Sequence, residues 1–194
     1  MKQQGNILFC GVGGQGILLA SEITAFVLIA SGFDVKKSEV HGMAQRGGSV
    51  VAHLRYGEKV FSPLIDIASA DIEVAFELLE SVRYLPYLNT KSKVIVNTQK
   101  ILPPSVSTGV EQYPDNLLDI LKEKDLSVFP INAFDMAKEA GDMRAVNMVL
   151  VGALSKFIPV NEDVFFNIIE EKIPKKILEI NRKAFIFGQK AVLT

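Results

Sequence analysis

Hydrophobic residues in the first part of the chain follow first a strand-like and then a helical pattern. An apolar run at 6–10 predicts a short buried strand, and the apolar-rich stretch 17–31 predicts the helix that follows it. Gly32 is the expected C-cap of that helix. Residues 35–40 predict a second short strand, so the chain opens with a strand–helix–strand unit.

Residues 49–56 alternate between apolar and polar side chains, which is typical of a half-buried strand. Gly57 and Glu58 then predict a tight turn into another short strand at 59–61. Because a hairpin departs from simple strand–helix–strand winding, we expect the sheet to be mixed.

The rest of the chain alternates strands with helices and becomes helical from Asn132 onward. Strands are predicted at 72–76, 93–97 and 126–131, and helices at 78–88 and 117–124, with Asp115 as the cap of the second helix. The segment 105–113 is predicted to be a loop or an edge strand. Four more helices are predicted at 134–140, 145–157, 163–171 and 175–191, with Pro159 and Pro174 at the breaks.

This order of elements predicts a single α/β domain over residues 1–194, a three-layer α/β/α sandwich around a mostly parallel, mixed sheet. Its C-terminal part, from about residue 132, is expected to be helical. The helix at 145–157 is apolar on nearly all faces, so we expect it to be buried within this chain or at an interface.

Composition and charge narrow the possible partners. The formal net charge is −1, which gives no reason to expect nucleic acid or an anionic membrane as a partner. The apolar stretch 17–30 is interrupted by Ser21, Glu22 and Thr24, so it is not expected to span a bilayer. The first residues lack the apolar region of a signal peptide, and the expected location is the cytoplasm.

Several kinds of catalytic site are missing from the sequence. Cys10 is the only cysteine, which excludes four cysteine ligands for an iron–sulfur cluster, and we expect it to be a small core residue. The sequence has no Ser/His/Asp elbow, HExxH motif, Walker lysine or GDG motif for a diphosphate and its metal. His53 lies among apolar neighbours and is expected to be structural. We therefore expect no catalytic and no metal-ligating residue in this chain.

The glycine-rich run GVGGQG at 11–16 directly follows the first predicted strand. Gly11, Gly13 and Gly16 have the G-x-G-x-x-G spacing of a Rossmann-like first unit, which permits a sharp turn and a close approach to a ligand. The following helix would direct free N–H groups at an anion. A turn that serves only close packing is the alternative.

A nicotinamide site would also need an acidic residue about 20 positions beyond the glycines, to bind the ribose hydroxyls. Asp34 precedes the second predicted strand, whereas Glu39 lies near its end, where such a residue belongs. Glu39 therefore has the position in the sequence that a nicotinamide site requires.

The loop at 41–48 follows the end of the second predicted strand, an edge that lines the ligand crevice in open α/β sheets. It combines His41, Gln45 and Arg46 with glycines such as Gly47. An arginine beside glycine suits a phosphate or a carboxylate, because its five donors are fixed and the backbone can approach closely. A surface loop without a ligand is the alternative.

Together the two loops resemble a known family. The runs GVGGQG at 11–16 and SEVHGMAQRGGSV at 38–50 closely resemble the gamma-type subunit of 2-oxoacid:ferredoxin oxidoreductases. The segment VHGMAQR at 40–46 is most similar to the small (beta) subunit of the indolepyruvate branch. Further matches are FSPLI at 61–65 and NMVLVGA at 147–153, so the resemblance covers at least residues 6–158.

The resemblance implies a non-catalytic but required subunit of an oxidoreductase. The family oxidatively decarboxylates 2-oxoacids, here indolepyruvate or another arylpyruvate, to acyl-coenzyme A and passes the electrons to ferredoxin. Thiamin diphosphate, Mg and 4Fe–4S clusters would belong to a large partner subunit, and this chain would at most contact coenzyme A. The residues expected to contact coenzyme A or the partner are Gly11, Gly13, Gly14, Gln15, Gly16, His41, Gln45, Arg46 and Gly47.

Two other interpretations stay open. The chain could be a free-standing NAD(P)- or flavin-binding oxidoreductase that uses the glycines and Glu39. It could also be a structural adaptor without a ligand site, in which the glycines only permit close packing.

Overall fold

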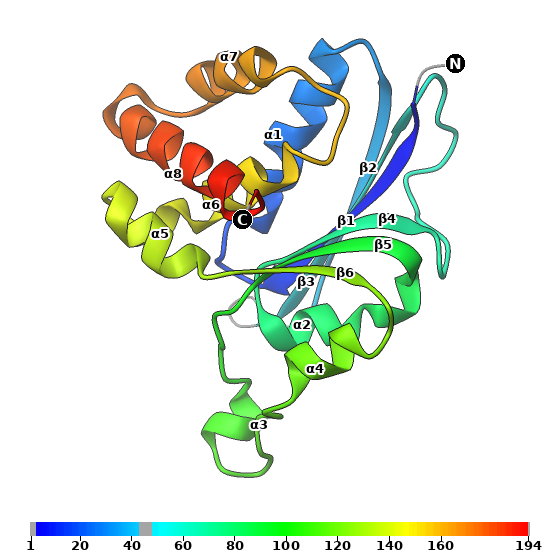
Figure 1. The fold of residues 1–194 in the computed structure, drawn as a ribbon, viewed down its shortest axis with the longest axis vertical. Helices are drawn as coiled ribbons and strands as arrows, with labels where there is room; N and C mark the ends of the chain where they lie inside the picture. Colours follow the sequence, from blue (N-terminus) through cyan, green and yellow to red (C-terminus); the bar gives the residue numbers. More distant parts are fainter. Residues whose placement is uncertain (1–2, 43–47, 194) are drawn as a thin grey trace.

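A six-stranded mixed sheet crosses the computed structural model, which describes residues 3–42 and 48–193 (Figure 1). The strands are β1 (Gly5–Val12), β2 (Asp34–His41), β3 (Ser49–Gly57), β4 (Ala70–Ala75), β5 (Leu88–Asn97) and β6 (Ser127–Ile131). Their order across the sheet is β2-β3-β1-β4-β5-β6. The strands β1, β4, β5 and β6 are parallel, whereas β3 is antiparallel to both of its neighbours. The predicted mixed, mostly parallel sheet is confirmed.

Helices cover both faces of this sheet (Figure 1). One face carries α1 (Ile17–Ala30), α5 (Ala133–Ala140), α6 (Val146–Leu154), α7 (Glu162–Lys172) and α8 (Leu178–Ala191). The other face carries α2 (Leu78–Arg83) and α4 (Leu117–Lys122), while the short α3 (Pro104–Ser107) projects beyond them. Three 3-10 turns complete the described part of the fold: η1 (Leu85–Tyr87), η2 (Met143–Ala145) and η3 (Lys175–Ile177). The α/β/α sandwich is therefore confirmed.

Strand β1 separates the two hydrophobic clusters. Ile7 and Phe9 pack into the cluster beneath α1 and α6, whereas Leu8 and Cys10 pack into the cluster beneath α2 and α4. All four side chains have no exposed surface. A strand covered on both faces must be apolar at every position, which explains the continuous apolar run in the sequence.

Helix α6 is buried along its whole length within this chain. It crosses α8 so closely that a Cβ atom on Gly152 would lie 2.0 Å from the carbonyl oxygen of Phe185. A Cβ on Gly188 would lie 1.8 Å from the carbonyl oxygen of Val149. The two glycines therefore let the helix backbones touch, and the apolar helix is covered by its own chain.

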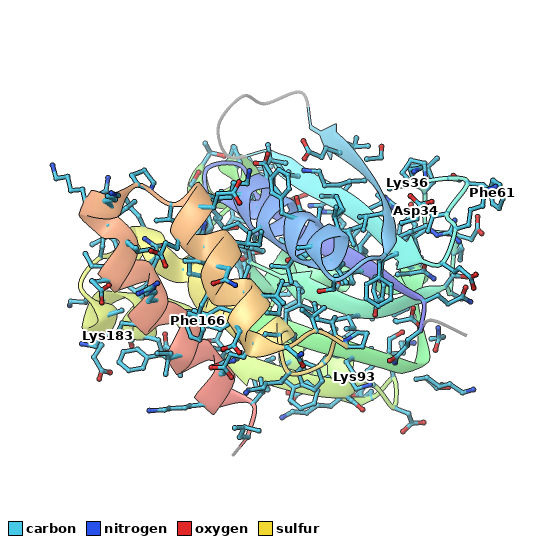
Figure 2. The ribbon with its side chains drawn as sticks, turned by 90° about the horizontal axis from the view of Figure 1, so that it is seen from above. Asp34, Lys36, Phe61, Lys93, Phe166 and Lys183 are labelled. Atoms are coloured by element: carbon cyan, nitrogen blue, oxygen red, sulfur yellow. The ribbon has the colours of Figure 1, made fainter. Side chains whose placement is uncertain are left out.

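The predicted strand at 59–61 is wrong. Both edges of β3 are already paired, one with β1 and the other with β2, so no edge is left for a strand that follows Gly57. The chain instead turns away, and the Val60 N–H donates to Asp34 Oδ2 over 2.8 Å. Phe61 projects from the end of the molecule near Asp34 and Lys36 and is 85% exposed (Figure 2).

Several predicted boundaries also need correction. The helix predicted at 78–88 ends at Arg83, because Pro86 enforces the 3-10 turn η1 and β5 begins at Leu88. Asp115 does not cap α4: Asn116 occupies the N-cap position and makes no side-chain cap bond. The segment 105–113 includes most of the short helix α3 rather than a strand, and the helix predicted at 145–157 ends at Leu154. The breaks at Pro159 and Pro174 are confirmed.

None of the helices in the described part of the chain combines the length and the hydropathy that crossing a bilayer requires.

We expect Gly188→Ala to lower the free energy of unfolding by about 2 kcal/mol, because the new methyl group would overlap the backbone of α6. In an uncrowded helix the same change would raise stability by up to about 1 kcal/mol, so the sign is informative. Urea unfolding of the full chain measures the difference. Lys190→Ala, on the exposed side of α8, is the control and should change little. A Gly188→Ala variant as stable as the unmodified protein would contradict the close crossing.

Candidate functional site

The glycine-rich turn connects the end of β1 to the start of α1. Strand β1 ends at Val12 and α1 begins at Ile17, so the turn comprises residues 13–16. Gly14 has φ 102° and Gly16 has φ 79°, a backbone region that strains residues with a side chain. The predicted strand–turn–helix unit is therefore present, and these two glycines are required by the backbone itself.

Gly11 has a packing role. It lies within β1, and a Cβ atom there would come within 2.7 Å of the Cβ of Phe76, directly after β4. The Phe76 N–H donates to the carbonyl oxygen of Cys10 over 2.8 Å. The absence of a side chain at Gly11 thus lets the ends of β1 and β4 stay in register.

Gln15 ties the turn to the sheet. Its Oε1 accepts the Val12 N–H over 2.8 Å, and its Nε2 donates to the carbonyl oxygen of Phe76 over 2.7 Å. The same carbonyl accepts Asn97 Nδ2 over 3.0 Å. Both ends of the Gln15 amide are therefore used within the chain, and a contact of this side chain with coenzyme A stays a prediction.

The two loops that carry the family resemblance meet in space. The Gly13 N–H donates to the carbonyl oxygen of Gly48 over 2.9 Å, and the Gly42 N–H donates to the carbonyl oxygen of Ser49 over 2.8 Å. The ends of the loop at 41–48 are therefore held beside the glycine-rich turn. His41 is the last residue of β2, and Gln45, Arg46 and Gly47 lie outside the described residues.

A groove of about 810 Å³ runs from the glycine-rich turn to the helices of the C-terminal part. Its lining includes Gly14, Gln15, Gly16, Leu19, Gln99, Ile101, Phe134, Asp142, Arg144, Asn147, Lys172, Lys176, Ile177, Ile180 and Asn181. Arg144 Nη2 lies 2.6 Å from Asp142 Oδ2, and this pairing lowers the pKa of Asp142 to about 2. The groove thus has apolar walls with a few basic and amide groups, as ligand sites commonly do.

Asn147, Arg144, Lys172 and Lys176 are groove residues that we did not predict from the sequence. The helix at 145–157 indicated only a buried element, and its one polar residue near the N-terminal end, Asn147, was the available signal. Lys172 is the last residue of α7, and Lys176 lies in the 3-10 turn η3. Because basic residues are common on any protein surface, these two lysines did not indicate a groove in the sequence.

The acidic residues considered for a nicotinamide site lie away from the turn. Strand β3 separates β1 from β2, so Glu39 on β2 is not on the neighbouring strand that such a site uses. Glu39 Oε1 instead pairs with Lys37 Nζ at 2.5 Å. Asp34 lies at the opposite end of β2, where it binds Lys36 Nζ at 2.8 Å.

Three glutamates, Glu73, Glu77 and Glu80, are buried on the other face of the sheet, below the end of β1. Glu73 Oε2 accepts Ser81 Oγ over 2.6 Å, Glu73 Oε1 contacts Cys10 Sγ at 3.6 Å, and burial raises the pKa of Glu73 to about 8. Burial also raises the pKa of the Cys10 thiol, and because this side chain is fully buried, the predicted small core residue is confirmed. Glu80 accepts a hydrogen bond from Ser49 Oγ and another from Arg83 Nε over 3.0 Å. These bonds support the first residue of β3.

His53 is structural, as the sequence indicated. It is 5% exposed, its Nδ1 accepts the Ile65 N–H over 3.2 Å, and burial lowers its pKa. Among the described residues, no group of three or more His, Cys, Asp or Glu side chains could hold a metal ion.

The sheet order and the joined loops define an α/β domain with a Rossmann-like turn and an adjoining groove. The chain belongs to the pyruvate ferredoxin/flavodoxin oxidoreductase family, whose model matches residues 6–191. It is 42% identical over 187 residues to the indolepyruvate oxidoreductase subunit IorB of Archaeoglobus fulgidus, which covers 94% of this chain and 92% of the relative. The resemblance inferred from the two loops is therefore confirmed.

Solved structures show the same fold. The gamma subunit of a keto/oxoacid ferredoxin oxidoreductase from Geobacter sulfurreducens matches with a TM-score of 0.73 at 22% identity, covering 97% of this chain and 98% of that one. The 2-oxoglutarate:ferredoxin oxidoreductase from Magnetococcus marinus, solved with 2-oxoglutarate, coenzyme A and succinyl-CoA bound, matches with a TM-score of 0.77 at 20% identity. The match covers all of this chain but only 32% of the Magnetococcus chain.

We expect Glu73→Gln to flatten the dependence of stability on pH. The folded protein holds a proton on Glu73 that the unfolded chain releases above its ordinary pKa, so rising pH lowers the free energy of unfolding. The loss is up to about 1.4 kcal/mol per pH unit from about pH 5 to pH 8.

Urea unfolding at pH 5, 6, 7 and 8 measures this slope. The Gln variant should be more stable than the unmodified protein at pH 8 and similar to it at pH 5. Glu58→Gln, at an exposed position, is the control. Equal slopes in the protein and in Glu73→Gln would show that Glu73 is already ionised in the fold.

Proposed function

We propose that the chain is the small, non-catalytic but required subunit of a 2-oxoacid:ferredoxin oxidoreductase. The observation that carries this proposal is the 42% identity to an indolepyruvate oxidoreductase subunit over nearly the full length of both chains. The geometry supports the proposal because the two characteristic loops, 11–16 and 41–48, are joined by the Gly13–Gly48 hydrogen bond.

The complex oxidatively decarboxylates indolepyruvate or a related arylpyruvate to an acyl-coenzyme A and passes two electrons to ferredoxin. A large partner subunit holds thiamin diphosphate, Mg and the 4Fe–4S clusters. The single cysteine of this chain supports that division of labour, because a 4Fe–4S cluster needs about four cysteine ligands. The complex works in the cytoplasm.

The glycine-rich turn and the loop at 41–48 form one wall of a site shared with the partner. Gly14 and Gly16 bring backbone N–H groups to this wall, and Gln45 and Arg46 orient coenzyme A or the partner. A domain of the same fold occupies about a third of the Magnetococcus chain, whose structure was solved with coenzyme A bound. Surfaces of the partner subunit would then complete the site.

A structural adaptor is the second candidate, and one observation favours it. Gly11 and Gln15 already have packing and hydrogen-bonding roles within the chain, so part of the glycine motif is explained without a ligand. A free-standing nicotinamide enzyme is less well supported, because β3 separates Glu39 from the glycine-rich turn.

Reconstitution tests the main proposal. The chain and its thiamin-containing partner, purified separately, should each be inactive, and mixing them should restore 2-oxoacid-dependent reduction of ferredoxin. Arylpyruvates should be better substrates than pyruvate. Full activity of the partner alone, or tight binding of thiamin diphosphate by this chain, would contradict the proposal.

Arg46→Ala separates a coenzyme contact from a purely structural role. If Arg46 contacts a phosphate of coenzyme A, the KM for coenzyme A of the reconstituted complex should rise about tenfold while assembly stays intact, because one charge-assisted hydrogen bond contributes about 1.5–3 kcal/mol. Steady-state kinetics and gel filtration of the same samples measure both quantities. Lys91→Ala, which removes an exposed cation near the start of β5, is the control. Weaker assembly with an unchanged KM would favour the adaptor.

A further inference from the structure

We propose that the outer edge of β2 pairs with β2 of a second copy of this chain, antiparallel to it and about a twofold axis. The two six-stranded sheets then form one continuous sheet across the dimer. The inference goes beyond the proposed function and does not depend on it, because it is argued from the strand itself.

Strand β2 is a long edge strand. It is the first strand in the order β2-β3-β1-β4-β5-β6, so its one neighbour among the described strands is β3. The strand has eight residues, and its register with β3 is unbroken from Asp34 to His41. An edge of this length presents a row of backbone groups to which another strand can bond.

The ladder with β3 shows which backbone groups point outward. The Gly42 N–H donates to the carbonyl oxygen of Ser49 over 2.8 Å, and these two residues continue the register of β2 with β3. In an antiparallel pair, bonded and non-bonded positions alternate, so Lys37 and Glu39 are non-bonded positions whose N–H and C=O groups point away from β3. No other backbone hydrogen bond joins either residue to the described part of the chain.

The lysines of β2 do not close this edge. A lysine on an edge strand usually discourages pairing, because its charge would be placed against another strand. In β2, however, Lys36 Nζ lies 2.8 Å from Asp34 Oδ1, and Lys37 Nζ lies 2.5 Å from Glu39 Oε1. Both lysines are therefore neutralised within the strand. The opposite edge of the sheet differs, since β6 contains Pro130, which has no N–H to donate.

Charge complementarity favours a second copy as the occupant of this edge. A twofold axis perpendicular to the sheet keeps each side chain on its own face, so it passes through a residue and not between two residues. An axis at Lys36, Lys37 or Glu39 would place like charges opposite each other, which is destabilising. An axis at Ser38 instead places Lys37 opposite Glu39 of the second copy, and Glu39 opposite Lys37 of the second copy.

This register brings four charges of alternating sign together on the face that carries α1. Lys37 Nζ lies 3.5 Å from Ser21 Oγ of α1, which identifies that face. The side chains of Lys37 and Glu39 are each 25% exposed, so they are still accessible to a second strand. Each lysine would then contact a glutamate of its own strand and a glutamate of the other strand.

The same register covers the exposed apolar residue of the strand on the other face. Val40 is 54% exposed. With the axis at Ser38, Val40 lies opposite Lys36 of the second copy, whose aliphatic stem can cover it while the ammonium group stays in water. The two Ser38 residues lie opposite each other at the axis. Both faces of the strand are therefore compatible with one and the same pairing.

Two charge reversals and their mixture test the proposal on the full chain. Lys37→Glu and Glu39→Lys should each weaken dimerisation about tenfold or more, because both cross-strand pairs become repulsive. An equimolar mixture of the two variants should form a heterodimer about as tight as the unmodified dimer, since opposite charges again face each other between copies. Sedimentation equilibrium over a series of concentrations measures these affinities.

The mixture also guards against a folding defect, because two misfolded variants would not restore each other. Lys91→Glu makes the same change of charge at an exposed position on β5 and is the control. It should dimerise as the unmodified chain does.

Amide hydrogen exchange distinguishes strand pairing from any other dimer. The amides of Lys37 and Glu39 should exchange about tenfold more slowly in the dimer than in the diluted monomer, because they become hydrogen-bonded. The amides of Lys36 and Ser38 bond to β3 in both states and should change little.

Three results would overturn the proposal: a monomer throughout the concentration series, two single variants that dimerise as tightly as the unmodified chain, or a dimer in which the amides of Lys37 and Glu39 stay unprotected. Protection of these amides only after a large partner subunit is added would also overturn it, because the edge would then accept a strand of a different protein.

Discussion

The carbonyl oxygen of Phe76 holds together the carboxyl-terminal ends of the central strands, where the glycine-rich turn lies. It accepts hydrogen bonds from the side-chain amides of Gln15 and Asn97, at 2.7 and 3.0 Å. Gln15 thereby fixes the glycine-rich turn to the end of β4. Asn97, at the end of β5, accepts the Ala133 N–H over 3.2 Å and thereby places the start of α5. Two neutral side chains thus align the carboxyl ends of β1, β4 and β5 with the helix that follows β6.

The two faces of the sheet are stabilised by different interactions. The face beneath α6 and α8 depends on close packing, with Gly152 and Gly188 allowing the helix backbones to touch. The opposite face has its own hydrophobic cluster and in addition buries three glutamates. Glu77 is 1% exposed, accepts from Tyr113 Oη over 2.6 Å and from the Ile101 N–H over 3.1 Å, and so holds the segment around α3 against α2. The groove lies on the face that carries α5, α6 and α8.

Elements with a strong local pattern were predictable from the sequence. The strand at 6–10, the turn at 11–16 and the helix at 17–31 correspond to β1, its turn and α1. The strand predicted at 59–61 was wrong because a favourable turn sequence does not show whether the edge of β3 is free. The helix predicted at 78–88 ends at Arg83, because Pro86 does not fit inside a helix. Pro86 is a local signal in the sequence, but the prediction followed the apolar pattern instead.

The sequence by itself determined the α/β class, the glycine-rich turn, the buried cysteine and the family, because periodicity, glycine spacing and a contiguous motif are local properties of a chain. Only the tertiary structure decided which distant residues meet. Asn147 faces Gly16 across 131 positions of sequence, Gly13 bonds to Gly48, and β3 separates Glu39 from the turn. These juxtapositions result from strand order and helix packing, which depend on the whole core rather than on any single segment.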